Sequence, residues 1–142
     1  EEIDIIAPKV KAGFVIKTMD FLYKGGRCSK LERFGANLLK IRPKIIVTSE
    51  GKMVPGKKYF GRSVGVVASY VEDTLAKNSN FDKEICFVTH SCATQEMVDE
   101  AVKLVKEAGF KNVLVTTAGA TITSHCGPKT LGILYFNDGG EN

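Results

Sequence analysis

The stretch ICFVTHSCATQEMVDEAVKLVKEAGFKNVLVT, residues 85–116, decides the fold class of this protein. It begins with an apolar run, Ile85–Thr89, that predicts a short buried strand, and it ends with Asn112–Thr116, which predicts a second one. Between them, Thr94 can cap a helix whose apolar residues recur at helical spacing, and Gly109 can end it. A strand, a helix and a strand of these lengths are typical of a βαβ unit, in which the strands are parallel and the crossover is right-handed.

The sequence on both sides of this unit predicts further strands and helices. Apolar or alternating runs indicate strands, apolar residues at helical spacing indicate helices, and a polar, glycine-bearing connection precedes the last strand. The expected strands are 10–15, 44–48, 53–60 and 131–136, the expected helices are 19–24, one from Ser29 and one from Ser63, and the connection is 117–129. We therefore expect an α/β fold: a single domain with a mixed β-sheet flanked by helices.

The composition is that of one globular domain. The chain has 142 residues, of which 44% are apolar and 25% are charged. No uninterrupted apolar run exceeds four residues, so we expect neither a transmembrane helix nor the core of a signal peptide. The four cysteines contain no CxxC pair, and Cys86 lies in an apolar run as a core thiol. The expected location is therefore the reducing cytoplasm.

Positive charge is concentrated in the first half of the chain. Residues 1–62 contain 14 Lys and Arg against 6 Asp and Glu, a balance of +8, whereas residues 63–142 contain 6 against 10, a balance of −4. The basic half can attract an acidic partner, a phosphate-bearing ligand or nucleic acid. A solvated lysine-rich face is an equal alternative, because the basic residues are dispersed rather than grouped in blocks.

The two histidines lie near predicted strand ends, in different surroundings. His125 lies in TITSHCGPKTLG, residues 121–132, which is rich in hydroxyl groups and contains a Gly127-Pro128 turn. Preorganised hydroxyl and imidazole donors can bind a carboxylate, but a turn whose polar side chains satisfy their own backbone explains the pattern equally well. His90 closes a strand, and here we favour a ring that bonds a nearby loop carbonyl over a ligand-binding role.

Nucleophilic or metal chemistry is the less favoured interpretation of the cysteines. His125 and Cys126 are adjacent, and in extended chain adjacent side chains point to opposite faces, so the pair should not form a hydrogen bond. His90 and Cys92 are two residues apart, so in extended chain their side chains point to the same face, but no third group that could orient them can be identified. These four residues lack the ligand spacings of a zinc site, and the sequence has no phosphate-binding loop or HExxH motif. We therefore expect no catalytic residue, no metal and no cofactor.

Three segments, in matching order and spacing, resemble motifs of the DegV family. FLYKGGRCS, residues 21–29, resembles the family's helix end L-x-x-L/G-G-R-I-S, with Cys28 in place of the usual isoleucine. LLKIRP, residues 38–43, followed by an extended run and Glu50-Gly51-Lys52, resembles L-L-x-I-K-P and D-G-K. SHCGPKTLG, residues 124–132, resembles the closing H-x-G-P-G-x-x-G, with Lys129 in place of the second glycine.

This resemblance implies a bacterial fatty-acid-binding protein, which in some members of the family presents its fatty acid to a fatty acid kinase. It covers only the carboxy-terminal half of such a protein. Residues 1–142 are therefore expected to be one lipid-binding domain whose amino-terminal domain is absent. The chain also opens at Glu1 without an initiator methionine, as expected of a fragment or a processed product. The implied ligand is a long-chain fatty acid.

The resemblance also implies roles for individual residues. The expected contacts of the fatty-acid carboxylate are His125, Ser124, Gly127 and Pro128. Apolar residues of the first third are expected to form the wall around the acyl chain, although their helical spacing also suits plain core. These are Phe14, Ile16, Phe21, Leu22, Phe34 and Leu38. The expected docking residues for a kinase subunit are Arg27, Arg33 and Arg62.

The sequence thus predicts a non-catalytic, cytoplasmic domain that buries a long acyl chain and holds its carboxylate near His125. Burial of each CH₂ group contributes about 0.8 kcal/mol, so a long chain can bind with few polar contacts. Two other functions are open at this point: an acyl-ester hydrolase using His125 or Cys126, and a nucleic-acid-binding module using the basic first half. The sequence does not show the surface of exposed aromatic and basic residues that a nucleic-acid-binding module needs, because Tyr and Phe fall mostly within apolar patterns.

Overall fold

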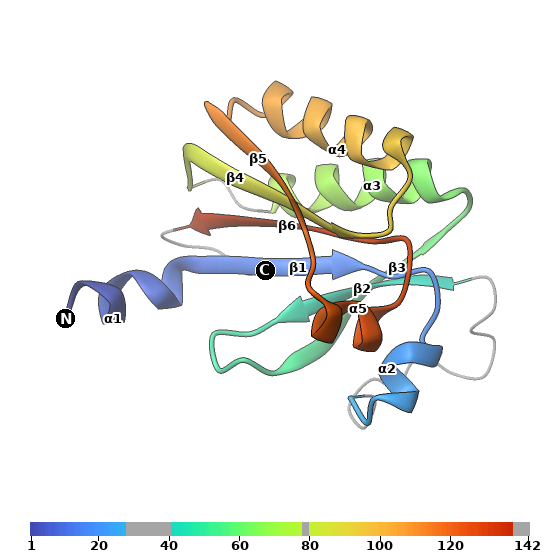
Figure 1. Ribbon diagram of the computed structural model, residues 1–142. Coiled ribbons are helices and arrows are strands. Elements are labelled where there is room, and N and C mark those ends of the chain that lie inside the picture. The colour runs from blue at the N-terminus through green and yellow to red at the C-terminus, as the bar shows by residue number, and fades with distance from the viewer. Residues whose placement is uncertain (28–40, 78–79, 138–142) are drawn as a thin grey trace.

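The protein is a six-stranded mixed sheet with helices on both of its faces (Figure 1). The computed structural model describes residues 1–27, 41–77 and 80–137. The strands are β1 Val10–Val15, β2 Ile41–Val47, β3 Met53–Phe60, β4 Phe81–Ser91, β5 Asn112–Thr117 and β6 Thr130–Asn137. The helices are α1 Glu2–Ile6, the 3₁₀ turn η1 Ala7–Lys9, α2 Asp20–Lys24, α3 Ser63–Ala76, α4 Gln95–Glu107 and α5 Ala120–Cys126. The strand order is β3-β2-β1-β6-β4-β5. This architecture confirms the predicted α/β fold.

The segment from β4 to β5 is the βαβ unit that the sequence predicts. The two strands pair in parallel, with Ile85 opposite Asn112, whereas the other described strand pairs are antiparallel. The hydroxyl oxygen of Thr94 accepts a hydrogen bond from the Met97 backbone N–H at 3.4 Å and caps α4. Gly109 follows the helix with φ of 99°, a conformation that glycine adopts without strain.

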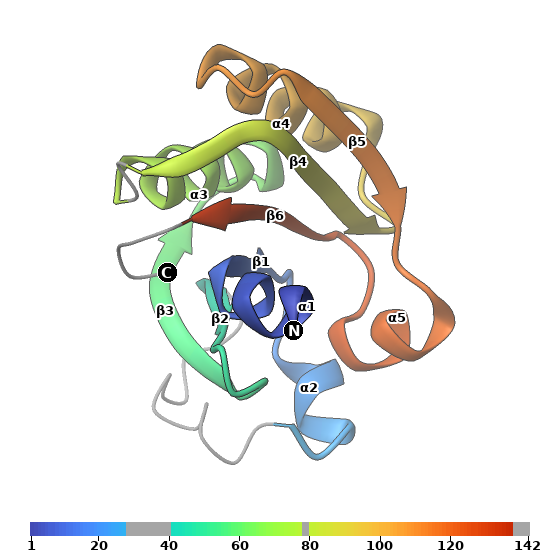
Figure 2. The ribbon, with the colours of Figure 1, turned by 90° about the vertical axis from the view of Figure 1, so that its left-hand side faces the viewer.

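Helices α3 and α4 pack together on one face of the sheet and enclose the main hydrophobic core (Figures 1 and 2). From α3, Val67 and Val71 are fully buried, as their spacing of four residues predicts. From α4, Ala101 and Val105 are fully buried in the same way. Val88 of β4 supplies part of the sheet surface beneath them. Because α3 and α4 cover this face of the sheet, the opposite face is available to other helices.

Helices α2 and α5 lie on that opposite side, next to each other (Figure 2). They lie near the carboxyl ends of β1 and β4, where β6 begins. This follows from the chain order, because α2 comes after β1 and α5 comes before β6. A second, smaller core cluster joins them to the sheet. Its buried members are Ile16, Met19, Leu22, Ile45 and Cys126.

Several boundaries differ from the sequence-based expectation. The connection 117–129 contains helix α5, although its β-branched and hydroxyl residues have low helix propensity; packing against α2 compensates. Strand β4, Phe81–Ser91, is longer than the expected 85–89. Strand β2 begins at Ile41, earlier than expected, and includes Pro43, where its pairing with β3 has a register shift. Such irregular positions tolerate proline. The short helix α1 was not expected, and the helix predicted from Ser29 lies outside the described residues.

A tyrosine hydroxyl is inserted between β1 and β6. Tyr70 of α3 is fully buried, and its hydroxyl donates to the Gly13 carbonyl at 2.6 Å. The same oxygen accepts a hydrogen bond from the Ile133 backbone N–H at 3.1 Å. Gly13 and Ile133 are opposite each other in the ladder, so the hydroxyl bridges two backbone groups that face each other across the strands. This bridge fixes α3 to the centre of the sheet.

Candidate functional site

A cavity of about 500 Å³ lies on the sheet face that α3 and α4 leave uncovered. Its floor is formed by the strands, with Ala12 and Phe14 from β1 and Leu134 from β6. These three residues project from the same face of the sheet, since Ala12 is opposite Leu134 in the ladder and Phe14 lies two residues further along β1. Val47 and Met53, from the β2–β3 hairpin, continue this apolar surface. The floor is therefore suited to an extended apolar ligand.

Helices α2 and α5 supply the other walls of the cavity. Leu22 lines it from α2, and Arg27 lines it just beyond the end of that helix. The lining residues of α5 are Thr121, Ile122, His125 and Cys126. The cavity thus combines an apolar floor with two basic side chains, Arg27 and His125, where α2 and α5 meet.

Two glycines allow α2 and α5 to meet closely. Gly25, the C-cap of α2, lies against the imidazole of His125, and a Cβ atom on Gly25 would collide with Nδ1. Gly127, the C-cap of α5, lies against the ring of Phe21, and a Cβ atom there would collide with that ring. Each helix end therefore accommodates a ring from the other helix. This packing brings the Gly-Gly-Arg and His-Cys-Gly-Pro segments together, although about a hundred residues separate them in the sequence.

The packing also determines which nitrogen of His125 a ligand can reach. Nδ1 is buried against Gly25 and has no hydrogen-bond partner among the described residues. The imidazole lines the cavity, so Nε2 is the nitrogen that a ligand can contact. Nearby, Arg27 donates from its guanidinium to the Gly25 carbonyl at 2.6 Å, which holds this side chain beside the same glycine. An imidazole and a guanidinium that lie beside the same glycine can both donate hydrogen bonds to an anionic group.

The hydroxyl groups near His125 are mostly engaged within the protein. Ser124 donates to the Thr121 carbonyl at 2.8 Å, and Thr130 donates to the Cys126 carbonyl at 3.1 Å. Ser91 donates to the Thr123 hydroxyl at 3.1 Å. These three hydroxyls therefore donate to groups within the protein. The basic side chains are the stronger candidates for the headgroup.

His90 is hydrogen-bonded to the loop that follows it, and Cys86 and Cys126 are buried thiols. His90 lines the cavity, and its Nδ1 accepts a hydrogen bond from the Ala93 backbone N–H at 3.4 Å, so it bonds a loop amide rather than the expected carbonyl. Cys126 is buried in a helix rather than in extended chain, and burial raises the pKa of its thiol. Burial raises the pKa of the Cys86 thiol to about 12. Within the described ranges, no group of three or more His, Cys, Asp or Glu could hold a metal ion.

The structure places the expected wall residues in different surroundings. Phe14 and Leu22 line the cavity, Ile16 lies in the buried cluster beneath α2, and Phe21 packs on Gly127. Phe34 and Leu38 lie outside the described residues. Lining residues that the sequence did not single out include Ala12, Val47, Met53, Thr89, Ile122 and Leu134. Strand alternation could have indicated Ala12 and Leu134, but the hairpin and α5 residues reach the cavity only through tertiary packing.

The remaining site predictions fall at the surface or outside the described residues. Gly127 is buried beneath Phe21, and Pro128 is exposed beside it. Arg62 is exposed at the start of α3, where its carbonyl accepts from the Val66 N–H. Arg33 lies in a segment that the structure does not describe. Arg27 alone among the expected docking residues lines the cavity, within the described part of the chain.

Comparison with known proteins identifies the relatives of this fold. A fatty acid-binding protein of Thermotoga maritima is 30% identical over 122 residues, which cover 86% of this chain and 42% of that protein. A DegV lipid binding protein structure from the same organism has a TM-score of 0.74 and 25% identity, covering 94% of this chain and 45% of that one. The fatty acid kinase (Fak) B3 protein of Streptococcus pneumoniae, loaded with linoleic acid, has a TM-score of 0.79 and 18% identity, covering 96% and 48%.

The chain spans about half the length of the curated relatives it matches. No helix among the described residues is long and apolar enough to cross a membrane. A family model described as an uncharacterised protein of the DegV family matches residues 1–138. The match covers nearly the whole sequence, and the chain belongs to the DegV family.

Proposed function

We propose that this chain is a fatty-acid-binding domain that buries an acyl chain along the sheet floor and binds the carboxylate near His125 and Arg27. The observation that carries the proposal is the 500 Å³ cavity, with its apolar floor and its two basic side chains where α2 and α5 meet. A fatty acid has the same division into a long apolar part and one anionic end. The names of the relatives, a fatty acid-binding protein and a lipid binding protein, support the same ligand class.

The energetics suit a long acyl chain. Each buried CH₂ contributes about 0.8 kcal/mol, so the apolar floor supplies most of the affinity. The carboxylate loses water when it enters the cavity, and charge-assisted hydrogen bonds from His125 and Arg27 offset that loss. Chain burial therefore determines how tightly the ligand binds, and the headgroup contacts determine which ligand binds and in which orientation.

We propose that the domain is non-catalytic. The raised pKa of the Cys126 thiol disfavours the thiolate that a hydrolase would need, and the Ser124 and Thr130 hydroxyls donate to backbone carbonyls. Its role in any phosphorylation is then to present the carboxylate to a kinase subunit. The basic first half of the chain, with Arg62 exposed, supports docking of an acidic partner surface. A cytoplasmic location remains a prediction of the sequence.

We further propose that a complete carboxylate site needs a second, amino-terminal domain. The relatives are about twice as long as this chain, and the Ser91 and Thr130 hydroxyls, which line the cavity, donate to groups within the protein. This chain by itself should therefore fold but bind fatty acid weakly. A two-domain relative should bind the same fatty acid more tightly.

Native mass spectrometry of the purified protein tests the function directly. A mass increment equal to a long-chain fatty acid, lost on delipidation and restored by added palmitate, is the expected result. Hydrolysis of an acyl ester that survives Cys126→Ser but not His125→Ala would contradict the non-catalytic role. A strongly salt-dependent affinity for nucleic acid, without lipid binding, would favour the basic-face alternative instead.

A further inference from the structure

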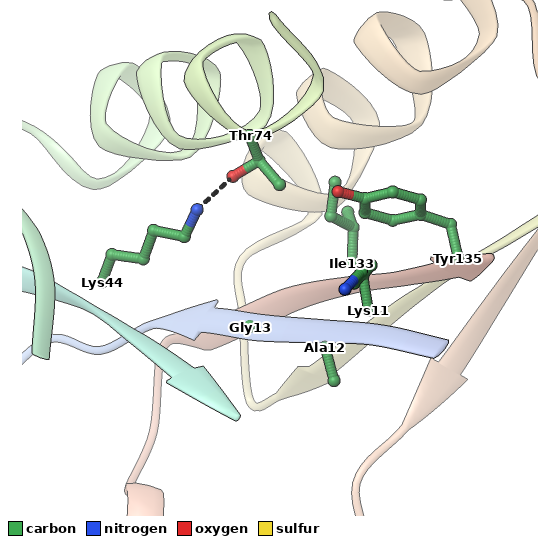
Figure 3. Close-up of a pocket in the computed structure, with 7 residues that line it drawn as sticks. All are labelled: Lys11, Ala12, Gly13, Lys44, Thr74, Ile133 and Tyr135. Carbon is green, nitrogen blue, oxygen red and sulfur yellow. Dashed lines mark hydrogen bonds between the residues drawn. The ribbon is translucent and has the colours of Figure 1, made fainter. Parts of the chain in front are cut away.

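A second, much smaller cavity lies on the other face of β1, under α3 (Figure 3). Its volume is about 10 Å³, close to the space that one water-sized guest needs. Figure 3 shows Lys44 and Tyr135 extending toward Thr74 from opposite sides of this space. Within the described ranges, the lining is Lys11, Ala12, Gly13, Lys44, Thr74, Ile133 and Tyr135, none of which is acidic.

Lys44 is the unusual member of this lining. It is 4% exposed, and its ammonium donates to the Thr74 hydroxyl at 2.9 Å. Nζ also lies 5.6 Å from the centre of the Tyr70 ring, within range of a cation–π interaction. An ammonium group has three N–H donors. In Lys44, one of them donates to the Thr74 hydroxyl, and the group as a whole faces the Tyr70 ring. The cation is therefore buried with part of its hydrogen-bonding capacity unused.

The described residues provide Lys44 with no carboxylate at ion-pair distance. Asp73, the residue before Thr74, instead binds Lys57 at 2.6 Å. Lys11 of β1 also contributes to the cavity lining. Burial and the nearby charge of Lys77 lower the pKa of Lys44 to about 8, so the group still carries its charge at neutral pH. The charge of Asp73 offsets only part of the cost of burying this cation, and a bound anion would reduce that cost further.

We propose that this cavity is a binding site for one small inorganic anion of chloride size, held by the ammonium of Lys44. Among the residues that the structure describes, no carboxylate lines the cavity, so an anion would balance the charge of Lys44 in a way that a neutral water molecule does not. The site is independent of the fatty-acid proposal. Ala12 and Gly13 line both cavities, so β1 separates this site from the large cavity on its other face.

Thermal unfolding in chloride against gluconate, at constant ionic strength, tests the site. Chloride should raise the Tm of the wild-type protein by about 3–5 °C at ten times its dissociation constant. Lys44→Met should abolish this response. Lys106→Met, which removes an exposed lysine of α4, should retain it. A chloride response that persists in Lys44→Met, or that is absent from the wild type, overturns the proposal.

Bromide replaces chloride in a second measurement that needs no variant. Crystals grown in bromide should show an anomalous peak within hydrogen-bonding distance of Lys44 Nζ. A refined water in that position, with no anomalous signal, also overturns the proposal. If Lys44→Met does not fold, this peak and a Lys44→Gln variant decide the question.

Discussion

Gly25 of α2 lies directly against the imidazole of His125 in α5, and any side chain at residue 25 would occupy space that the ring fills. The contact buries Nδ1 and leaves Nε2 available to the cavity. The glycine therefore sets the orientation of the histidine without contacting a ligand.

Gly25→Ala should weaken fatty-acid binding by displacing His125. We expect a loss of about tenfold or more in affinity, since a charge-assisted hydrogen bond contributes about 1.5–3 kcal/mol. Isothermal titration with palmitate measures the loss. Gly65→Ala is the matched control, because a Cβ there meets open space, and it should leave the affinity unchanged. Equal affinity in the wild type and Gly25→Ala would mean that the ring position does not matter.

His125→Ala should discriminate between a fatty acid and the fatty alcohol of equal chain length. Loss of one hydrogen bond to a carboxylate should cost about 1.5–3 kcal/mol, or about 10- to 150-fold in affinity. The alcohol has no carboxylate, so its affinity should fall much less, and chain burial should preserve some binding of both. Competitive displacement of a fluorescent fatty acid compares the two ligands. Equal losses would show that His125 only holds the packing of α2 and α5.

Tyr70→Phe should destabilise the fold while leaving the volume of the core almost unchanged. The hydroxyl serves both the Gly13 carbonyl and the Ile133 N–H, and both groups are left without that partner. Each unsatisfied buried group costs about 1–3 kcal/mol, so denaturant titration should show a clear loss of unfolding free energy. Tyr23→Phe, at a tyrosine that is 69% exposed, should change the stability by less than about 0.5 kcal/mol.

Lys44 should give the protein a distinct dependence of stability on pH. Its pKa is about 8 in the folded protein against 10.5 for a free side chain, so the unfolded chain binds more protons between these values. Stability attributable to this residue should therefore rise with pH across that window. The difference in unfolding free energy between the wild type and Lys44→Met isolates this contribution.

The comparison with Lys44→Met is necessary because other groups titrate in the same range. Asp73, Lys77 and Lys11 are the charged groups near Lys44. Burial raises the pKa values of Tyr70 and Tyr135 and of the Cys86 and Cys126 thiols, so these groups lower the stability as pH rises in both proteins. A flat difference between the two proteins from pH 7.5 to 10 would contradict the lowered pKa of Lys44.

The sequence determined the elements whose signal is local. The apolar run of β4, the Thr94 cap and the amphipathic face of α4 each lie within a few residues, and together they define the βαβ unit. The alternation along β1 likewise predicts which of its residues share a face. The family motifs also drew attention to His125 and Arg27, but they did not predict that both residues line the same cavity.

Tertiary structure alone decided how the cavity is assembled. Helix α5 has poor intrinsic propensity and is stabilised by α2, so no local pattern predicts it. The meeting of Gly25 with His125 depends on where the sheet places two segments about a hundred residues apart. The burial of Lys44 is of the same kind, since a lysine in a strand looks solvent-exposed until α3 packs over it. Local sequence specifies propensity and periodicity, whereas contacts between distant segments arise only once the whole sheet has formed.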